Sequence, residues 1–357
     1  MTIDRRCTVR AFQSLCLYLI IMARPRFLPD NFTLMLVTTV LIASLLPCKG
    51  GVAKAFNVVT TISIGLLFFL HGAKLSREAV VEGAMHWRLH LTVLMFSFVL
   101  FPLLGLMLKP VFLPLVTPDL YLGILFLCTL PSTVQSSIAF TSVARGNVPA
   151  AVCSASASNL IGIFLTPVLV GLIVVSHGQG HGSFGSIMNI VLQLLLPFVA
   201  GQIARRWIGN WVDGHKAILK FVDQGSILLV VYTAFSEAVV QGLWSQLPAI
   251  SLVGLLVVLS VLLFSMLAIA TFLSRRLGFN KEDEITIVFC GSKKSLASGV
   301  PMANVLFASR TVGMVVLPLM LFHQIQLMVC AVLAKRYAER PRNLAASIIA
   351  KSDSASL

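Results

Sequence analysis

The chain is built from long apolar runs separated by short polar stretches. A helix that spans a bilayer needs about 20 predominantly apolar residues, and runs of this kind recur along most of the sequence. We predict ten membrane-spanning helices, at about 32–47, 57–74, 89–108, 120–143, 148–176, 185–204, 219–240, 247–273, 284–307 and 311–334. The polar segments between them are too short for a soluble domain, so the sequence predicts an all-α multi-pass membrane protein.

Composition and charge support this prediction. Hydrophobic residues make up 57% of the chain and charged residues 11%, which excludes an ordinary soluble domain. The net charge of +14 could indicate a nucleic-acid partner. With the N-terminus inside, however, most basic residues fall on the inner face, and the outer face holds only Lys49, Lys54, Lys109 and Arg310. This is the positive-inside pattern. We expect a bacterial inner (plasma) membrane protein with both termini cytoplasmic and no nucleic-acid partner.

The two ends of the chain lie outside the predicted membrane domain. Residues 1–21 place arginines before a short apolar stretch, without the small-residue cleavage site of a signal peptide. We expect translation to start at Met22, with a genuine N-terminal extension as the alternative. The membrane domain then covers 22–340, and a cytoplasmic tail covers 341–357. The seven cysteines have neither metal-ligand spacing nor the pattern of a disulfide framework.

The ten spans divide into two sets of five, about 32–176 and about 185–334, around the polar segment 177–184. Because five is odd, the second set enters the membrane from the opposite side, which permits an inverted repeat. The string STVQSSIA at 132–139 aligns without gaps with CGSKKSLA at 290–297. Both strings are polar interruptions at the same place in their half.

Helix-breaking residues accompany both interruptions. Pro131 precedes the first, and Gly291, Gly299 and Pro301 bracket the second. Proline removes a backbone donor and glycine relaxes the backbone. Broken helices at membrane depth are tolerated where they line a cavity or are buried in protein, and matching breaks in two halves indicate a transport site. We therefore expect helices four and nine to be broken and to cross.

Four strings carry a resemblance that covers about residues 22–345: FFLHGAKLS at 68–76, ARGN at 144–147, YTAFSEAV at 232–239 and FCGSKKSLA at 289–297. Together they resemble the bile acid:sodium symporter family, and in particular a subgroup with bacterial and animal members. The resemblance implies a ten-helix fold with a core formed by spans 3–5 and 8–10. A panel would be formed by spans 1, 2, 6 and 7.

The chain departs from the sodium-coupled members of that family at the ninth-helix break. Where those members carry a Glu-x-Gly-x-Gln-Asn motif with sodium ligands, this chain has Phe289, Lys293 and Lys294. The glutamine that the family carries in the third span is Ser97 here, before Pro102. An ammonium group has three donors and no acceptor, so we expect the second sodium site to be absent. A positive charge would stand in its place.

The first sodium site of the family remains open in this sequence. Hydroxyls of span four and oxygens of span five could still supply ligands, and a single site would lie near Ser136, Ser137 and Ser154. The full set of candidate substrate- or ion-binding residues is Ser132, Thr133, Gln135, Ser136, Ser137, Ser154, Ser158, Asn159, Glu237, Ser292, Lys293, Lys294 and Ser295.

The lysine pair allows two interpretations. Two charges at mid-bilayer are costly, which favours a functional role, either in binding an anionic group or in proton coupling. Alternatively, both ammonium groups donate to carbonyls that the helix break frees. On a helix the two side chains would diverge by about 100°, so one could face a cavity while the other finds a carboxylate, a carbonyl or water.

Other polar residues within the spans also have two interpretations. Glu237 is either the acidic counterpart of the lysines or a carboxylate that reaches the outer surface, and Asp223 and Glu284 lie nearer span ends. His71 and Lys74 are expected to anchor the second span at the cytoplasmic face. Hydrogen bonding between helices is expected for His323, Gln324 and Gln326, with a place in the lining of a cavity as the alternative.

These features favour a secondary transporter that moves a small organic, anionic solute by alternating access, coupled to sodium or to a proton. No cofactor is expected apart from that coupling ion. A regulatory membrane protein without transport is the main alternative. An intramembrane hydrolase using Ser292 or Ser295 with a lysine base is the other, although adjacent residues rarely aim at one atom. Substrate, direction, stoichiometry and oligomeric state stay open.

Overall fold

The computed structural model describes residues 31–74, 86–175, 184–242 and 249–340. The predictions on residues 1–21, the start at Met22 and the tail at 341–357 lie outside this part of the chain. Within it all regular structure is helical and there is no strand. The prediction of an all-α protein therefore holds for the part that the structure describes.

The first part of the described chain comprises helices α2 (Asn31–Leu45), α3 (Gly50–Lys74), α5 (Trp87–Met95), the π-helix η2 (Phe96–Leu100), α6 (Phe101–Met107), α7 (Lys109–Phe112), α8 (Pro118–Thr129), α9 (Gln135–Val143) and α10 (Val148–Val175). The second part comprises α11 (Phe184–Gly214), α12 (Lys216–Val240), α14 (Ala249–Arg276), α15 (Lys281–Gly291), α16 (Leu296–Leu306) and α17 (Ser309–Ala338).

Six helical segments among the described residues are long and apolar enough to cross a membrane. They are Gly50–Lys74, Trp87–Met107, Val148–Ile173, Lys216–Val240, Ile250–Arg276 and Thr311–Ala338. These helices support a multi-pass membrane protein. The count of ten spans and the inverted repeat stay predictions.

Both expected helix breaks are present. Helix α8 ends at Thr129 and α9 begins at Gln135, while α15 ends at Gly291 and α16 begins at Leu296. The residues between them, 130–134 and 292–295, are not helical. We call these two segments the first break and the second break.

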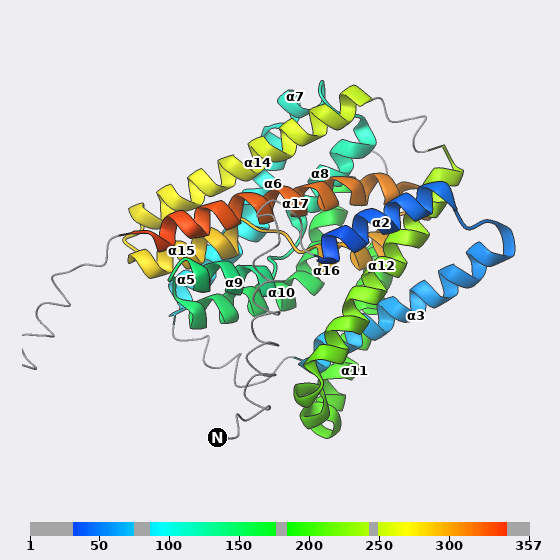
Figure 1. The fold of residues 1–357 in the computed structure, drawn as a ribbon, viewed down its shortest axis with the longest axis horizontal. Helices are drawn as coiled ribbons and strands as arrows, with labels where there is room; N and C mark the ends of the chain where they lie inside the picture. The colour runs from blue at the N-terminus through cyan, green and yellow to red at the C-terminus, as the bar shows by residue number, and fades with distance from the viewer. Residues whose placement is uncertain (1–30, 75–85, 176–183, 243–248, 341–357) are drawn as a thin grey trace, which may run out of the picture.

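The helices pack in two groups, which Figure 1 shows side by side. In one group α3 packs along α11, and α12 packs against α2 and α3. Gly72 and Gly201 let the α3 and α11 backbones touch, because a Cβ at either position would overlap a carbonyl of the other helix. The second group contains α5, η2, α6, α8–α10 and α14–α17. This grouping agrees with the panel and core that the resemblance implies.

The core between these helices is mainly apolar, and many of its buried polar side chains gather around the two breaks. Its largest fully buried side chains are mainly Phe and Leu, but they include Lys293 and Lys294, each 0% exposed. Ser132, Ser137 and Ser292 are buried beside them. Buried polar groups are retained where they find partners, so the breaks are the place to look for chemistry.

Candidate functional site

The two breaks satisfy each other's backbone. Ser132 Oγ of the first break donates to Cys290 O at 2.5 Å, and Ser137 Oγ donates to Phe289 O at 3.1 Å. In the other direction, the Ser295 amide donates to Pro131 O at 2.9 Å. The last carbonyls of a helix have no partner within the helix. Here each break supplies the donors that the other helix end lacks.

Lys294 completes this exchange. Its Nζ donates to three backbone carbonyls, those of Ser97 at 2.7 Å, Cys128 at 2.8 Å and Leu130 at 2.7 Å. The same ammonium lies 4.1 Å from the centre of the Phe101 ring. Three donors meet three acceptors, so the hydrogen-bonding capacity of this buried ammonium is filled.

The local sequence explains why these carbonyls are open. Helix η2 has π-type bonding, in which the Phe101 amide donates to Phe96 O. The next bond of that kind would run from residue 102 to Ser97 O, but Pro102 has no N–H. Cys128 and Leu130 lie at the C-terminal end of α8, where carbonyls lack helical partners. Lys294 therefore caps a helix end and a π-helix at once.

Lys293 has different surroundings. Its Nζ lies 3.4 Å from Ser136 Oγ, 4.4 Å from the centre of the Phe140 ring and 5.6 Å from that of Phe289. No ion pair to Lys293 is present among the described residues. Aromatic faces stabilise a cation, but they accept no conventional hydrogen bond. The Lys293 ammonium is thus less completely satisfied than that of Lys294.

Gln326 of α17 fixes the backbone between the lysines and α16. The Lys294 amide donates to Gln326 Oε1 at 2.9 Å, and Gln326 Nε2 donates to Lys294 O at 3.0 Å. Nε2 also lies 2.9 Å from His323 Nδ1. The predicted interhelical bonding of Gln326 is therefore present, and it positions the second break.

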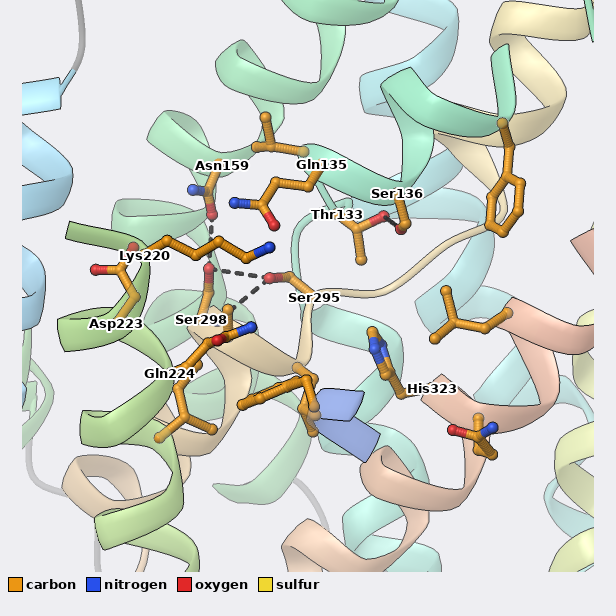
Figure 2. A pocket seen from close by; sticks show the side chains of 18 of the residues that line it. Thr133, Gln135, Ser136, Asn159, Lys220, Asp223, Gln224, Ser295, Ser298 and His323 are labelled. Carbon is orange, nitrogen blue, oxygen red and sulfur yellow. Dashed lines mark hydrogen bonds between the residues drawn. The ribbon is translucent and has the colours of Figure 1, made fainter. Parts of the chain in front are cut away.

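A cavity of about 630 Å³ lies against both breaks. In Figure 2 the side chains of Thr133, Gln135 and Ser136 from the first break and α9 face Ser295 and Ser298. Asn159 of α10 joins this wall by accepting a hydrogen bond from Ser298 Oγ at 2.7 Å. Apolar side chains complete the lining, among them Phe140, Ile227, Leu296, Leu327 and Met328.

The N-termini of two helices point at this cavity. Residues Val134–Ser136 at the start of α9 and residues Ser295–Ser298 at the start of α16 line it. Val134 offers no side-chain cap to α9, whereas Ser295 Oγ accepts only the Ser298 amide of α16. First-turn amides lack helical partners, and a helix N-terminus carries about half a positive charge. Two such ends at one cavity favour an anion.

The opposite wall belongs to α3 and α12, and it is charged. Figure 2 shows Lys220, Asp223 and Gln224 entering the cavity from α12. His71 of α3 also lines it. Lys220 and the lining residue Lys335 of α17 are exposed, so the cavity reaches the protein surface at a basic rim.

The structure sorts the predicted site residues into three sets. Five line the cavity: Thr133, Gln135, Ser136, Asn159 and Ser295. Six lie behind its wall, where they bind backbone, one another or hydroxyls of the lining: Ser132, Ser137, Ser158, Ser292, Lys293 and Lys294. Two lie apart from it: Ser154, whose Oγ is 2.6 Å from His90 Nδ1, and Glu237, near the far end of α12. Neither lysine lines the cavity.

Sequence reasoning missed the charged wall of the cavity. We assigned His71 and Lys74 to anchoring and set Asp223 aside as a residue near a span end, and Lys220 and Ser298 were not considered as site residues. Asp223 lies two turns into α12 and pairs with Lys74 of α3. An acidic residue inside a predicted membrane helix was the signal that could have drawn attention to this wall.

The residues suggested for a single sodium ion fit it poorly. The hydroxyls of Ser136 and Ser137 lie 2.8 and 3.0 Å from Thr133 Oγ1, but Ser154 bonds His90 instead. The Lys293 ammonium beside Ser136 would oppose a second cation there. The hydrolase arrangement is not assembled either, because Ser292 Oγ donates to Val288 O and Ser295 Oγ to Ser298 Oγ.

Comparison with known proteins places these features in a family. Residues 30–339 match the model described as the SBF-like CPA transporter family. The chain is 67% identical to "Uncharacterized protein PA2026" of Pseudomonas aeruginosa over 92% of this chain and 98% of that protein. It is 58% identical to "Putative symporter YfeH" of Escherichia coli K12, over 91% and 98%. Sodium/bile acid cotransporter 7-B of Xenopus laevis is 30% identical, over 86% and 91%.

Proposed function

The chain belongs to the SBF-like CPA transporter family, and on this premise we propose that it is a secondary transporter that carries a small organic anion by alternating access. Family membership supports transport. The finer statement, that the solute is anionic and binds at the breaks, rests on the cavity at the N-termini of α9 and α16. That cavity is the observation that carries the proposal.

The cavity suits an amphipathic anion. Its volume of about 630 Å³ falls within the range of small-molecule sites, roughly 300–1,000 Å³. The first-turn amides of α9 and α16 would bind a carboxylate or a similar group, while Phe140, Leu296 and Leu327 would contact an apolar part. Lys220 and Lys335 at the rim would attract anions from solution.

The lysines take separate roles in this account. Lys293 touches Ser136 at the start of α9, and its charge would add to the positive potential behind the anion site without contacting the solute. Lys294 would act as a tethered cation, with its ammonium on the Ser97, Cys128 and Leu130 carbonyls. The resemblance implies that this pair replaces side chains that hold sodium in the sodium-coupled members of the family.

Alternating access would move the group of α2, α3, α11 and α12 against the other helices, since the cavity lies between them. The rim with Lys220 and Lys335 corresponds to the predicted inner face, and the described conformation would then be open to the cytoplasm. We place the protein in the bacterial inner membrane, with both termini cytoplasmic.

A thermal-shift screen of the purified protein against organic anions, followed by uptake into proteoliposomes, tests this function. Ala297 lies in the first turn of α16 and lines the cavity. Ala297→Asp places a carboxylate where the anion should bind. The interaction of this carboxylate with the helix dipole should stabilise the protein by roughly 0.3–1 kcal/mol. We expect Ala297→Asp to keep its melting temperature and lose anion binding.

Ala297→Asn is the matched neutral control and should bind the anion far better than Ala297→Asp. Equal binding by both variants would contradict an anion site at α16. Binding by the wild type without any flux would favour the alternative of a regulatory membrane protein.

A further inference from the structure

A cluster of titratable groups faces the cavity from the wall opposite the breaks. His71, in the last turn of α3, and Asp223, on α12, both line the cavity. Lys74 Nζ forms an ion pair with Asp223 Oδ2. Figure 2 shows Asp223 on the α12 side, across from Ser295 and Asn159. The proposed anion site and this cluster therefore share one cavity but belong to different helix groups.

The tautomer of His71 follows from its contact with the backbone. Nδ1 lies 2.7 Å from Leu67 O, and a carbonyl oxygen can only accept a hydrogen bond. Nδ1 therefore carries the hydrogen, and Nε2 of the neutral ring is an acceptor. Uptake of one proton at Nε2 turns this acceptor into a donor and gives the ring a positive charge.

The Asp223 carboxylate can compensate the positive charge of a protonated His71 ring. Its Oδ2 pairs with Lys74, but its Oδ1 is buried without a hydrogen-bond partner among the described residues. A buried carboxylate oxygen without a donor is costly. His71 and Asp223 line the same cavity, so the Asp223 carboxylate can offset the positive charge of a proton on the His71 ring.

The other charges around His71 are accounted for. Lys74 on α3 and Lys220 on α12 are basic, and Asp223 is the only carboxylate among the described residues that line the cavity. Arg205 of α11 donates to Ala73 O and pairs with Asp213, which occupies its guanidinium. From α17, His323 and Lys335 line the same cavity. Each proton gained here makes a basic cavity more attractive to an anion.

We propose that His71, with Asp223 as its counter-charge, forms a proton-binding site and that the proton on His71 is the coupling ion for anion transport. This inference rests on the proposed function. The proton comes from the compartment to which the cavity is open, binds His71 Nε2, and leaves on the other side together with the solute. Sodium is a poor occupant, because the site offers one imidazole nitrogen and one carboxylate oxygen beside an ammonium group. By linkage, the anion and the proton strengthen each other's binding.

Sodium-free proteoliposomes test the proposal, using the organic anion that most stabilises the wild type in the thermal-shift screen. For one proton per monovalent anion, an inward gradient of one pH unit should drive about tenfold accumulation. His71→Gln should abolish this accumulation, while anion exchange at equal pH continues with a weakened affinity for the anion. Asp223→Asn should weaken the accumulation severalfold.

His215→Gln is the matched control. His215 Nδ1 also contacts a carbonyl four residues earlier, Trp211 O at 2.8 Å, but His215 is exposed and does not line the cavity. The His215→Gln variant should accumulate the anion like the wild type. Continued exchange by His71→Gln would show that the variant is folded.

The outcomes separate the two proposals. If the wild type exchanges the anion but ignores the pH gradient, or if His71→Gln still accumulates it, the proton site is wrong and the anion transporter stands. If the wild type neither binds nor exchanges any anion, the proposed function fails and the proton-coupling proposal fails with it.

Discussion

Lys293 and Lys294 are adjacent in sequence and equally buried, yet their ammonium groups meet different surroundings. Lys294 donates to three backbone carbonyls that helix ends and a π-helix leave open. Lys293 lies beside two aromatic rings and makes one long contact with a cavity-lining hydroxyl. The Lys294 charge therefore stabilises the structure, whereas the Lys293 charge is available to influence the cavity.

This comparison also shows why a buried charge need not bind the solute. The mid-membrane lysines were the strongest functional signal in the sequence. In the structure the cavity is lined instead by the first turns of α9 and α16 and by charges on α3 and α12. The contacts of Lys294 agree with the capping interpretation. Lys293 lies behind the cavity wall and does not line the cavity.

The largest effect is expected for Lys294→Met. Methionine keeps the length of the side chain but leaves the Ser97, Cys128 and Leu130 carbonyls buried without a donor. Removing one side of a buried charged network costs about 3–5 kcal/mol, so the melting temperature of the purified protein should fall strongly. Chromatography of heated, detergent-solubilised protein measures this. A melting temperature equal to that of the wild type would contradict the capping role.

Lys293→Met is expected to separate stability from binding. The unbranched apolar side chain of methionine can pack beside Phe140 and Phe289, so the free energy of unfolding should change by less than about 1 kcal/mol. Loss of the charge behind Ser136 should weaken anion binding about tenfold, which corresponds to about 1.4 kcal/mol. Titration calorimetry with the anion measures the affinity. If Lys293→Met melted as early as Lys294→Met, the two lysines would not differ as described.

A smaller effect is expected for Ser137→Ala, which removes the hydroxyl donor to Phe289 O. A buried hydrogen bond contributes about 1 kcal/mol, so the melting temperature should fall moderately. Ser142→Ala on the exposed face of the same helix is the control, and it should melt like the wild type. Equal melting of both variants would show that the Ser137 hydroxyl does not cap α15.

The smallest effect concerns the aromatic contact of Lys293. Phe289→Leu removes one ring from the ammonium, and a cation–π contact contributes about 0.5–2 kcal/mol. A double-mutant cycle of Phe289→Leu with Lys293→Met isolates this contact from the loss of packing. We expect a coupling free energy near the lower end of that range. Additive melting shifts would indicate that the ring does not stabilise the ammonium.

Much of the architecture could be predicted because its causes are local. Pro131, Gly291 and the polar strings around them indicate where helices must break, and both breaks occur there. The resemblance to the bile acid:sodium symporter family is confirmed by the family match. The mutual contact of the breaks could be expected too, since open carbonyls inside a membrane require donors.

The arrangement of the site could be predicted only in part. That Lys294 caps Ser97 depends on a π-helix and on Pro102 in another span, and the sequence alone does not reveal the register of this contact. Ser154 binds His90 because rotation about the axis of α10 decides which residues meet. Glu237 lies outside the cavity because it is near the far end of α12. Asp223 looked peripheral by its position in the chain, although α12 carries it to the cavity wall.

A cryo-electron microscopy structure with the stabilising anion bound tests the central claim most directly. We expect density for the anionic group between the first turns of α9 and α16, within hydrogen-bonding distance of the backbone amides at Ser136 and Ala297. The Lys294 ammonium should still contact its three carbonyls, which completes the prediction. Density for the anionic group against the Lys293 or Lys294 ammonium, away from both helix N-termini, would contradict it.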